Sequence, residues 1–249
     1  FTTDLAAALA GEYPATDSFV VAMNDAGRHH AYPPAVRFSV DEHDVAGYRR
    51  AVDFLNVSNV DVLSLQHEYG IFGGRAGALV LSLLGELRMP IVTTLHTILA
   101  DPDPAQRRVM DEILRLSERL VVMSAHGAGL LERVHGVSPD RIDLIPHGIP
   151  EVMFAAGDKD RLGVEGKVVL LTFGLLSPDK GIEYVIDALP AILEACPDTV
   201  YIVLGATHPH VLAHAGESYR LMLEARAQRL GVDASMIFHN RFVAQAELG

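Results

Sequence analysis

The sequence contains little of what disulfide-linked, membrane-spanning or nucleic-acid-binding proteins need. Cys196 is the single cysteine among 249 residues, so an intrachain disulfide is excluded and a reducing, cytoplasmic setting is favoured. No apolar run is long enough to cross a bilayer, and the first residues lack the pattern of a signal peptide. The formal net charge of -12 argues against nucleic acid or an anionic membrane surface as a partner, although it does not exclude a small phosphorylated ligand.

Several enzyme motifs are also absent. No Gly-x-Gly-x-x-Gly follows an expected strand and no Gly-x-Ser-x-Gly occurs, which argues against a nicotinamide dehydrogenase and against a hydrolase with a nucleophile elbow. Two groups of histidines are candidate metal ligands. His29 and His30 lie in a proline-bearing loop, while His208, His210 and His214 have no Cys-x-x-Cys or His-Glu-x-x-His motif to support them. We therefore predict no metal site.

Strand-like and helix-like segments alternate twice along the chain, on either side of a polar, glycine-bearing segment at residues 157–166. This alternation predicts an α/β protein with two Rossmann-like domains, residues 1–156 and 157–249. The chain opens on an alanine-rich helix with no strand before it and stops as another helix begins, so we expect a fragment whose second domain is incomplete. The expected strands are residues 18–24, 60–66, 90–95, 120–123, 142–145, 168–173, 200–204 and 236–239.

The segment 168–193 combines a strand, a turn and a helix. Its apolar run at 168–173 predicts a strand covered on both faces, and apolar residues at helical spacing follow from Ile182. Lys180 and Gly181 therefore lie where the carboxyl end of a strand leads into a helix N-terminus. Backbone N–H groups and the helix dipole favour an anion at such a place. The alternative interpretation is a solvated lysine beside an ordinary turn.

Three other strand ends carry candidate functional residues, because ligands of open α/β sheets bind at the carboxyl ends of the strands. The second expected strand is followed by the octet His67-Glu68-Tyr69-Gly70-Ile71-Phe72-Gly73-Gly74. The alternative to a functional role for this octet is a glycine-rich connection in which Glu68 is solvated. His96 follows the third strand, and the alternative to a catalytic role is that of a structural hydrogen-bonding residue. Gly205, Thr207 and His208 follow the strand at 200–204, where the alternative is a polar surface loop.

The pattern Gly174-x-x-Ser177-Pro178-x-Lys180-Gly181 ahead of an amphipathic helix resembles the phosphate loop of family 4 glycosyltransferases of the GT-B fold. The octet that starts at His67 is similar to a mannosyltransferase-like subgroup of that family. The segment Pro146-His147-Gly148-Ile149 resembles the family's Pro-Asn-Gly-Val at the crossing into the second domain, with histidine in place of asparagine. The resemblance implies two Rossmann-like domains that face each other across a cleft.

The resemblance also implies a reaction. A sugar, with mannose as the first candidate, would move with retention from a GDP- or UDP-sugar to a hydroxyl of a sugar or lipid-linked acceptor, with no cofactor and no strict need for a divalent metal. His96 and Glu68 would be the catalytic residues. The donor-binding residues would be Gly174, Lys180, Gly181, Gly205, Thr207 and His208, and the acceptor-side loop would contain His67, Tyr69, Gly73 and Gly74.

Some family features are missing from the sequence. Leu175 stands where the family usually has an arginine that contacts phosphate. The glycine-rich loop before the first helix would lie upstream of Phe1, and the Glu-x7-Glu segment would lie beyond Gly249. Segments outside this sequence are also where the resemblance allows a peripheral membrane contact. The alternatives are a nucleotide-binding scaffold protein that has lost the chemistry, and an epimerase or phosphorylase on the same fold.

Overall fold

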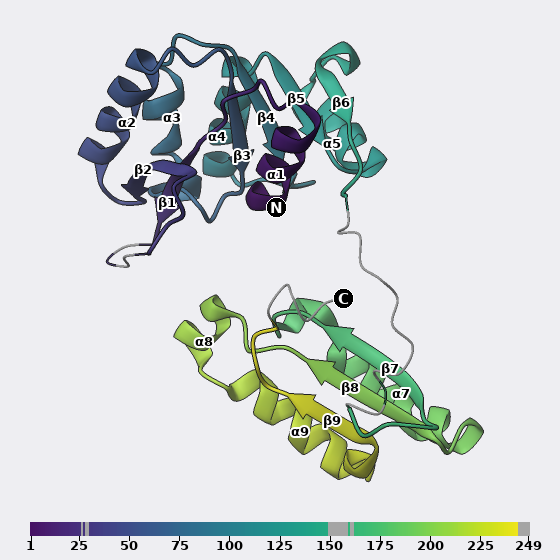
Figure 1. Cartoon of the computed structure of the whole chain (residues 1–249). Coiled ribbons are helices and arrows are strands. Elements are labelled where there is room, and N and C mark those ends of the chain that lie inside the picture. The colour runs from purple at the N-terminus through teal and green to yellow at the C-terminus, as the bar shows by residue number, and fades with distance from the viewer. Residues whose placement is uncertain (26, 28–29, 149–158, 160–161, 244–249) are drawn as a thin grey trace. The chain divides into compact units, whose positions relative to one another are not determined.

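The computed structural model describes residues 1–25, 27, 30–148, 159 and 162–243. The chain divides into two compact units, residues 1–149 and residues 150–249, and each is described by itself (Figure 1). The predicted boundary between residues 156 and 157 lies outside the described residues, as do residues 157, 158, 160 and 161 of the predicted linker. None of the described helices has the length and apolar character needed to cross a membrane.

The first unit contains parallel strands and the helices that connect them. β3 (Leu63–His67), β4 (Ile91–Leu95), β5 (Arg119–Val122) and β6 (Ile142–Leu144) form a four-stranded parallel sheet in that order, while β1 (Val20–Asn24) and β2 (Val36–Asp41) form a separate parallel pair. The two sheets share one core, because Val40 of β2 and Leu65 of β3 are buried in the same hydrophobic cluster. The helices are α1 (Thr2–Glu12), α2 (Val45–Val57), α3 (Val80–Leu84), α4 (Pro104–Leu116) and α5 (Ala125–His135).

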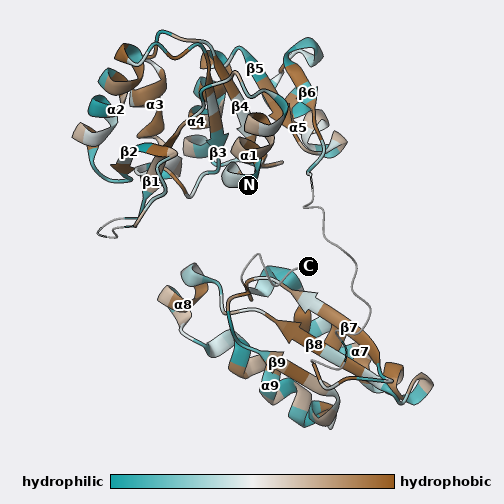
Figure 2. Ribbon diagram, in the orientation of Figure 1, coloured by the Kyte–Doolittle hydropathy of each residue, from teal (hydrophilic) through white to brown (hydrophobic). Residues whose placement is uncertain are grey.

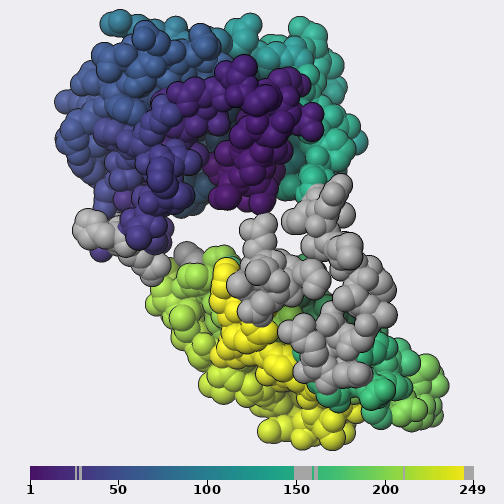
Figure 3. Space-filling model, viewed as in Figure 1, coloured from purple at the N-terminus to yellow at the C-terminus, as the bar shows by residue number. Residues whose placement is uncertain are grey.

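The predicted strands of this unit are confirmed. β2 was not predicted, although the burial of its residues alternates from Val36 to Val40 as expected for a strand with one buried face. After Gly74, a 3₁₀ turn (Arg75–Gly77) precedes the short α3, and Ala76 has a φ of 56°. α1 lies on the surface of the unit (purple in Figure 3), and none of its residues is buried.

The second unit contains a three-stranded parallel sheet and three described helices. β7 (Val168–Phe173), β8 (Thr199–Leu204) and β9 (Met236–His239) are hydrogen-bonded in that order and are largely hydrophobic (brown in Figure 2). α7 (Ile182–Ala195), α8 (Pro209–Ala215) and α9 (Ser218–Leu230) follow the strands. Ile186 of α7 and Leu223 of α9 pack with Tyr201 of β8 in one buried cluster.

β7 differs from the prediction. The apolar run predicted a strand with both faces covered, but Leu171 is 54% exposed and Phe173 is 62% exposed. β7 is an edge strand of its sheet, and the buried cluster contains Leu170 and Tyr201, which are paired in register, but neither Leu171 nor Phe173. Successive residues of a strand point to opposite faces. The described helices therefore cover only one face of β7.

Candidate functional site

β3 and β4 carry a polar face that ends at the predicted catalytic residues. Gln66 and Thr94 are partners in the parallel register, and the pairing continues beyond β4, because the N–H of His96 donates to the carbonyl of His67 at 3.1 Å. Side chains alternate between the two faces of a sheet. Ser64, Gln66 and Glu68 of one strand therefore share a face with Thr94 and His96 of the other.

His96 is hydrogen-bonded to this polar face. Its Nε2 lies 3.0 Å from Oε1 of Gln66, and the amide nitrogen of Gln66 donates to Ser64 Oγ at 3.1 Å and to Thr94 Oγ1 at 3.4 Å. Partial burial lowers the pKa of His96, while the nearby Glu68 carboxylate opposes that shift. Imidazole with a lowered pKa is neutral at physiological pH, so His96 is suited to hydrogen bonding with a polar ligand.

Glu68 lies beside His96 and has both carboxylate oxygens occupied. Oε1 accepts the backbone N–H of Tyr69 at 2.9 Å, and Oε2 accepts the hydroxyl of Thr97 at 2.6 Å. These bonds fix the carboxylate at the carboxyl ends of β3 and β4. The geometry brings the two predicted catalytic residues together, and it adds Gln66 and Thr97, for which no role was predicted. The alternation Leu63-Ser64-Leu65-Gln66 is the sequence signal that marks Gln66.

His67 points to the opposite face, into the core. Its side chain is fully buried between the rings of Tyr69, at 5.1 Å between centroids, and Phe72, at 6.1 Å. Neither ring nitrogen has a hydrogen-bond partner, and the buried hydroxyl of Tyr69 also has none. Burial lowers the pKa of His67 to about 4 and raises the pKa of Tyr69 to about 12, so both side chains are neutral at pH 7. Their acceptor-side role stays a prediction.

Gly73 and Gly74 allow a close backbone contact and a backbone conformation that a side chain would disturb. A Cβ on Gly73 would lie 1.9 Å from the carbonyl oxygen of Glu42, and its N–H donates to the hydroxyl of Tyr48 at 3.2 Å. Gly74 has a φ of 82° and precedes the 3₁₀ turn at Arg75, a conformation that favours glycine. The contact that the structure gives Gly73 is therefore with its own chain, at the segment that follows β2.

Loops in the second unit extend the sheet beyond its strands. Gly205 approaches Gly174 so closely that a Cβ on Gly205 would lie 1.9 Å from the carbonyl oxygen of Gly174. Leu176 and Thr207 continue the pairing as an isolated parallel bridge. Thr207 is buried and donates through its hydroxyl to Glu217 at 2.6 Å, while His208 is exposed. The predicted residues after β7 and β8 are thus brought together at one edge of this sheet.

Lys180 is exposed at the same end of β7. It is the last residue of a 3₁₀ turn, and Gly181, with a φ of 63°, is the N-cap of α7 and provides no side-chain cap. The side chain of Lys180 forms no hydrogen bond or ion pair with the residues that the structure describes. The other two lysines are engaged, because Lys167 pairs with Asp198 at 2.9 Å and Lys159 donates to the Lys167 carbonyl at 2.8 Å. An exposed cation and an uncapped helix end therefore occur together.

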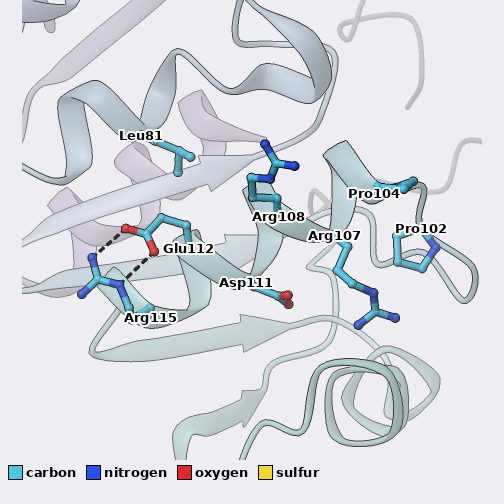
Figure 4. A pocket seen from close by; sticks show the side chains of 8 residues that line it. All are labelled: Leu81, Pro102, Pro104, Arg107, Arg108, Asp111, Glu112 and Arg115. Atoms are coloured by element: carbon cyan, nitrogen blue, oxygen red, sulfur yellow. Dashed lines mark hydrogen bonds and ion pairs between the residues drawn. The ribbon is translucent and has the colours of Figure 1, made fainter.

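A shallow hollow of about 810 Å³ lies along α4 (Figure 4) and contains none of the predicted site residues. Glu112 pairs with Arg115 through two hydrogen bonds of 2.8 and 2.6 Å, and Arg107 donates to the Val134 carbonyl at 2.9 Å. Two of the three arginines that line this hollow therefore already have hydrogen-bond partners within the protein. Its lining residues are Leu81, Pro102, Pro104, Arg107, Arg108, Asp111, Glu112 and Arg115.

Among the residues that the structure describes, no group of three or more histidine, cysteine, aspartate and glutamate side chains is placed to hold a metal ion. His29 lies outside the described residues, and the side chain of His210 is not described. In the first unit, the ring of His96 instead lies 4.8 Å from that of Phe1 and 6.5 Å from that of His147.

Solved structures confirm the predicted GT-B fold class. Anabaena HepE, in complex with UDP and glucose, aligns with a TM-score of 0.66 and 19% identity over 83% of this chain and 56% of that chain. Sucrose-phosphate synthase of Thermosynechococcus elongatus aligns with a TM-score of 0.63 and 16% identity over 89% of this chain and 59% of that chain. At these identities the likeness concerns the fold.

Sequence comparisons agree with the resemblance found in the motifs. The D-inositol 3-phosphate glycosyltransferase of Segniliparus rotundus is 30% identical over 185 residues, which cover 68% of this chain and 39% of that protein. The enzyme of the same name from Rhodococcus erythropolis is 26% identical over 191 residues, covering 70% of this chain and 42% of that protein. The chain thus spans about two-fifths of these relatives. Because the profile of Glycosyltransferase Family 4 matches residues 2–151, the chain belongs to glycosyltransferase family 4.

Proposed function

We propose that this chain is part of a glycosyltransferase that moves a sugar from a nucleoside-diphosphate sugar to a hydroxyl group of an acceptor. The observation that carries the proposal is the exposed Lys180 beside the uncapped N-terminus of α7, at the carboxyl end of β7. Membership of family 4 supports it. Further support comes from the names of the relatives, which are glycosyltransferases, and from the UDP bound in the structurally similar HepE.

Charge stabilisation at the leaving group is the chemistry that this corner of the second unit offers. When the bond between sugar and diphosphate breaks, negative charge develops on the diphosphate. Lys180 and the first turn of α7, which has no side-chain cap, would stabilise that charge. Leu175 offers no charge where the family usually has arginine, so Lys180 carries a larger share of the binding than it would beside an arginine.

The first unit would contact the sugar. His96 is neutral and hydrogen-bonded through one ring nitrogen, so the other is available to a sugar hydroxyl. Glu68 places a fixed negative charge next to His96. Both residues act by positioning and electrostatics, which are the main sources of catalysis where the protein itself forms no covalent intermediate.

We assign the finer features of the reaction as follows. The donor is a UDP- or GDP-hexose, with mannose suggested by the loop that starts at His67 and glucose by the ligand of HepE. The acceptor is a hydroxyl of a sugar or of a phosphorylated polyol, a class suggested by the inositol phosphate in the relatives' names. Transfer occurs with retention and without a strict need for a divalent metal. The single cysteine is the basis for a cytoplasmic location.

Nucleotide binding tests the proposal through Lys180. Titration calorimetry with UDP and with GDP should show binding that Lys180→Ala weakens by about 10- to 100-fold, the range of one hydrogen bond to a charged group. His96→Ala should spare nucleotide binding, because the nucleotide carries no sugar to contact. Lys167→Ala is the matched control, since it removes a lysine that is paired with Asp198.

Two outcomes would contradict this assignment. One is equal loss of nucleotide affinity in the Lys180→Ala and Lys167→Ala variants, and the other is a larger loss in His96→Ala than in Lys180→Ala. Transfer is tested separately by following the anomeric signals of the donor and product by NMR with inositol phosphate as acceptor. Nucleotide binding without transfer in the parent protein would favour the scaffold alternative.

A further inference from the structure

Gln66 is the contact that links the polar face of β3 and β4 to His96. Its carbonyl oxygen Oε1 lies 3.0 Å from Nε2 of His96. Its amide nitrogen points the other way along the same face, toward Ser64 Oγ at 3.1 Å and Thr94 Oγ1 at 3.4 Å. Two hydroxyl groups thus hold the two N–H bonds of the amide. The side chain is half-buried, which limits competition from water.

We propose that Gln66 is a positioning residue that holds His96 as the tautomer with hydrogen on Nε2 and leaves Nδ1 as a hydrogen-bond acceptor. A carbonyl oxygen can only accept, so the hydrogen of this contact belongs to the imidazole. Ser64 and Thr94 act through Gln66, because they orient the amide so that its oxygen faces His96. The assignment concerns the resting protein and needs no ligand.

A neutral amide has a different effect on His96 from a carboxylate. Glu68 is the negative group near His96, and the imidazole of His147 also lies near it, with 6.5 Å between the ring centroids. A carboxylate at position 66 would add a second negative charge and favour the imidazolium form. Gln66 fixes the ring without that charge, so His96 stays neutral and keeps a lone pair on Nδ1.

The consequence for the reaction rests on the proposed function. An Nδ1 lone pair can accept a hydrogen bond from a sugar hydroxyl but cannot donate one. His96 would then recognise its hydroxyl as a donor, and a fluorine at the same carbon would not replace it. Gln66 itself touches no substrate in this scheme, because its oxygen and its nitrogen are both engaged within the sheet.

Imidazole NMR of the full chain tests the proposal directly. With ¹⁵N-labelled histidine and without nucleotide, the His96 signals should show hydrogen on Nε2 and slow exchange of that hydrogen with water. Gln66→Leu should make the exchange roughly fivefold faster, as expected for the loss of one ordinary hydrogen bond. Gln228→Leu is the matched control, because it makes the same substitution on an exposed part of α9.

A conservative variant separates positioning from packing. Gln66→Glu keeps the size and the acceptor, so it should preserve slow Nε2–H exchange while raising the pKa of His96 by roughly one unit through the added negative charge. Hydrogen on Nδ1 in the wild-type protein would overturn the proposal, and so would unchanged exchange in Gln66→Leu. Neither outcome depends on nucleotide binding, so a failure here is distinct from a failure of the Lys180 test.

Discussion

The two units contain candidate sites at strand ends, but the sites are held together in different ways. In the first unit, side chains hold one another: Gln66 bonds to His96, and Thr97 bonds to Glu68. In the second unit, the two loops make a close backbone contact, because Gly205 packs directly against the carbonyl oxygen of Gly174. The side chain of Lys180 there is exposed and has no hydrogen bond or ion pair with the described residues.

This difference matches two tasks that a transferase needs. Groups that orient a sugar must be fixed before the substrate arrives, because a loosely held side chain loses positioning energy. A group that neutralises a diphosphate gains most when no internal ion pair has to be broken first. The satisfied polar network of the first unit suits orientation, and the unpaired cation of the second unit suits anion binding.

The largest effect that sharpens the comparison is expected from Gly205→Ala. Its Cβ would lie 1.9 Å from the Gly174 carbonyl oxygen, and Gly205 has a φ of 154°, so the two loops would have to separate. We expect a loss of at least about 4 kcal/mol, the size of a severe steric substitution. Hydrogen exchange followed by mass spectrometry should show lost protection in β7 and β8 and unchanged protection in β3 and β4.

Gly70→Ala is the control for this substitution, because a Cβ on Gly70 would meet nothing within 4 Å. It should leave protection unchanged in both units. Normal protection of β7 and β8 in Gly205→Ala would show that the backbone contact does not hold the second site, and the contrast between the units would fail.

An intermediate effect is expected from the buried His67. Its pKa in the folded protein is about 4 against an ordinary value of 6.5, so the unfolded chain binds a proton more readily between these values. The stability is therefore fully present above about pH 6.5 and decreases as the pH falls toward 4. The full shift is worth about 3 kcal/mol, of which about 2 kcal/mol is lost by about pH 5.

His67→Leu checks this pH dependence in the first unit. The variant removes two buried nitrogens that have no partner, so it should lose less stability than the wild type between about pH 7.5 and about pH 5. Urea unfolding at both pH values, combined with hydrogen exchange in β3, measures the difference. An equal loss in variant and wild type would show that carboxylates, and not His67, cause the pH dependence.

The sequence predicted the positions of most elements and which strand ends carry polar residues. Apolar runs such as residues 200–204 indicate strands because burial requires them, and parallel strands bring their carboxyl ends to one edge. Ser124 and Gly136 at the ends of α5 are features of the same kind, because a hydroxyl cap and a left-handed glycine have local causes.

Contacts that depend on register could not be predicted. Gln66 meets Thr94 and His96 only because β3 and β4 pair in one register, which no short segment specifies. The same limit applies to glycine, because no short segment shows that the carbonyls of Glu42 and Gly174 approach Gly73 and Gly205.

The smallest expected effect concerns the helix ends that distinguish the units. Ser124 caps α5 by accepting the N–H of Gly127 at 3.1 Å, whereas α7 begins at Gly181 without a side-chain cap. Ser124→Ala would give α5 an uncapped start like that of α7, at a cost of about 1 kcal/mol. The urea midpoint of the first unit should fall accordingly, while Ser18→Ala, at an exposed serine ahead of β1, should leave it unchanged. An unchanged urea midpoint in Ser124→Ala would mean that α5 does not need its side-chain cap. The missing cap of α7 would then be no evidence that the first turn of α7 needs a partner.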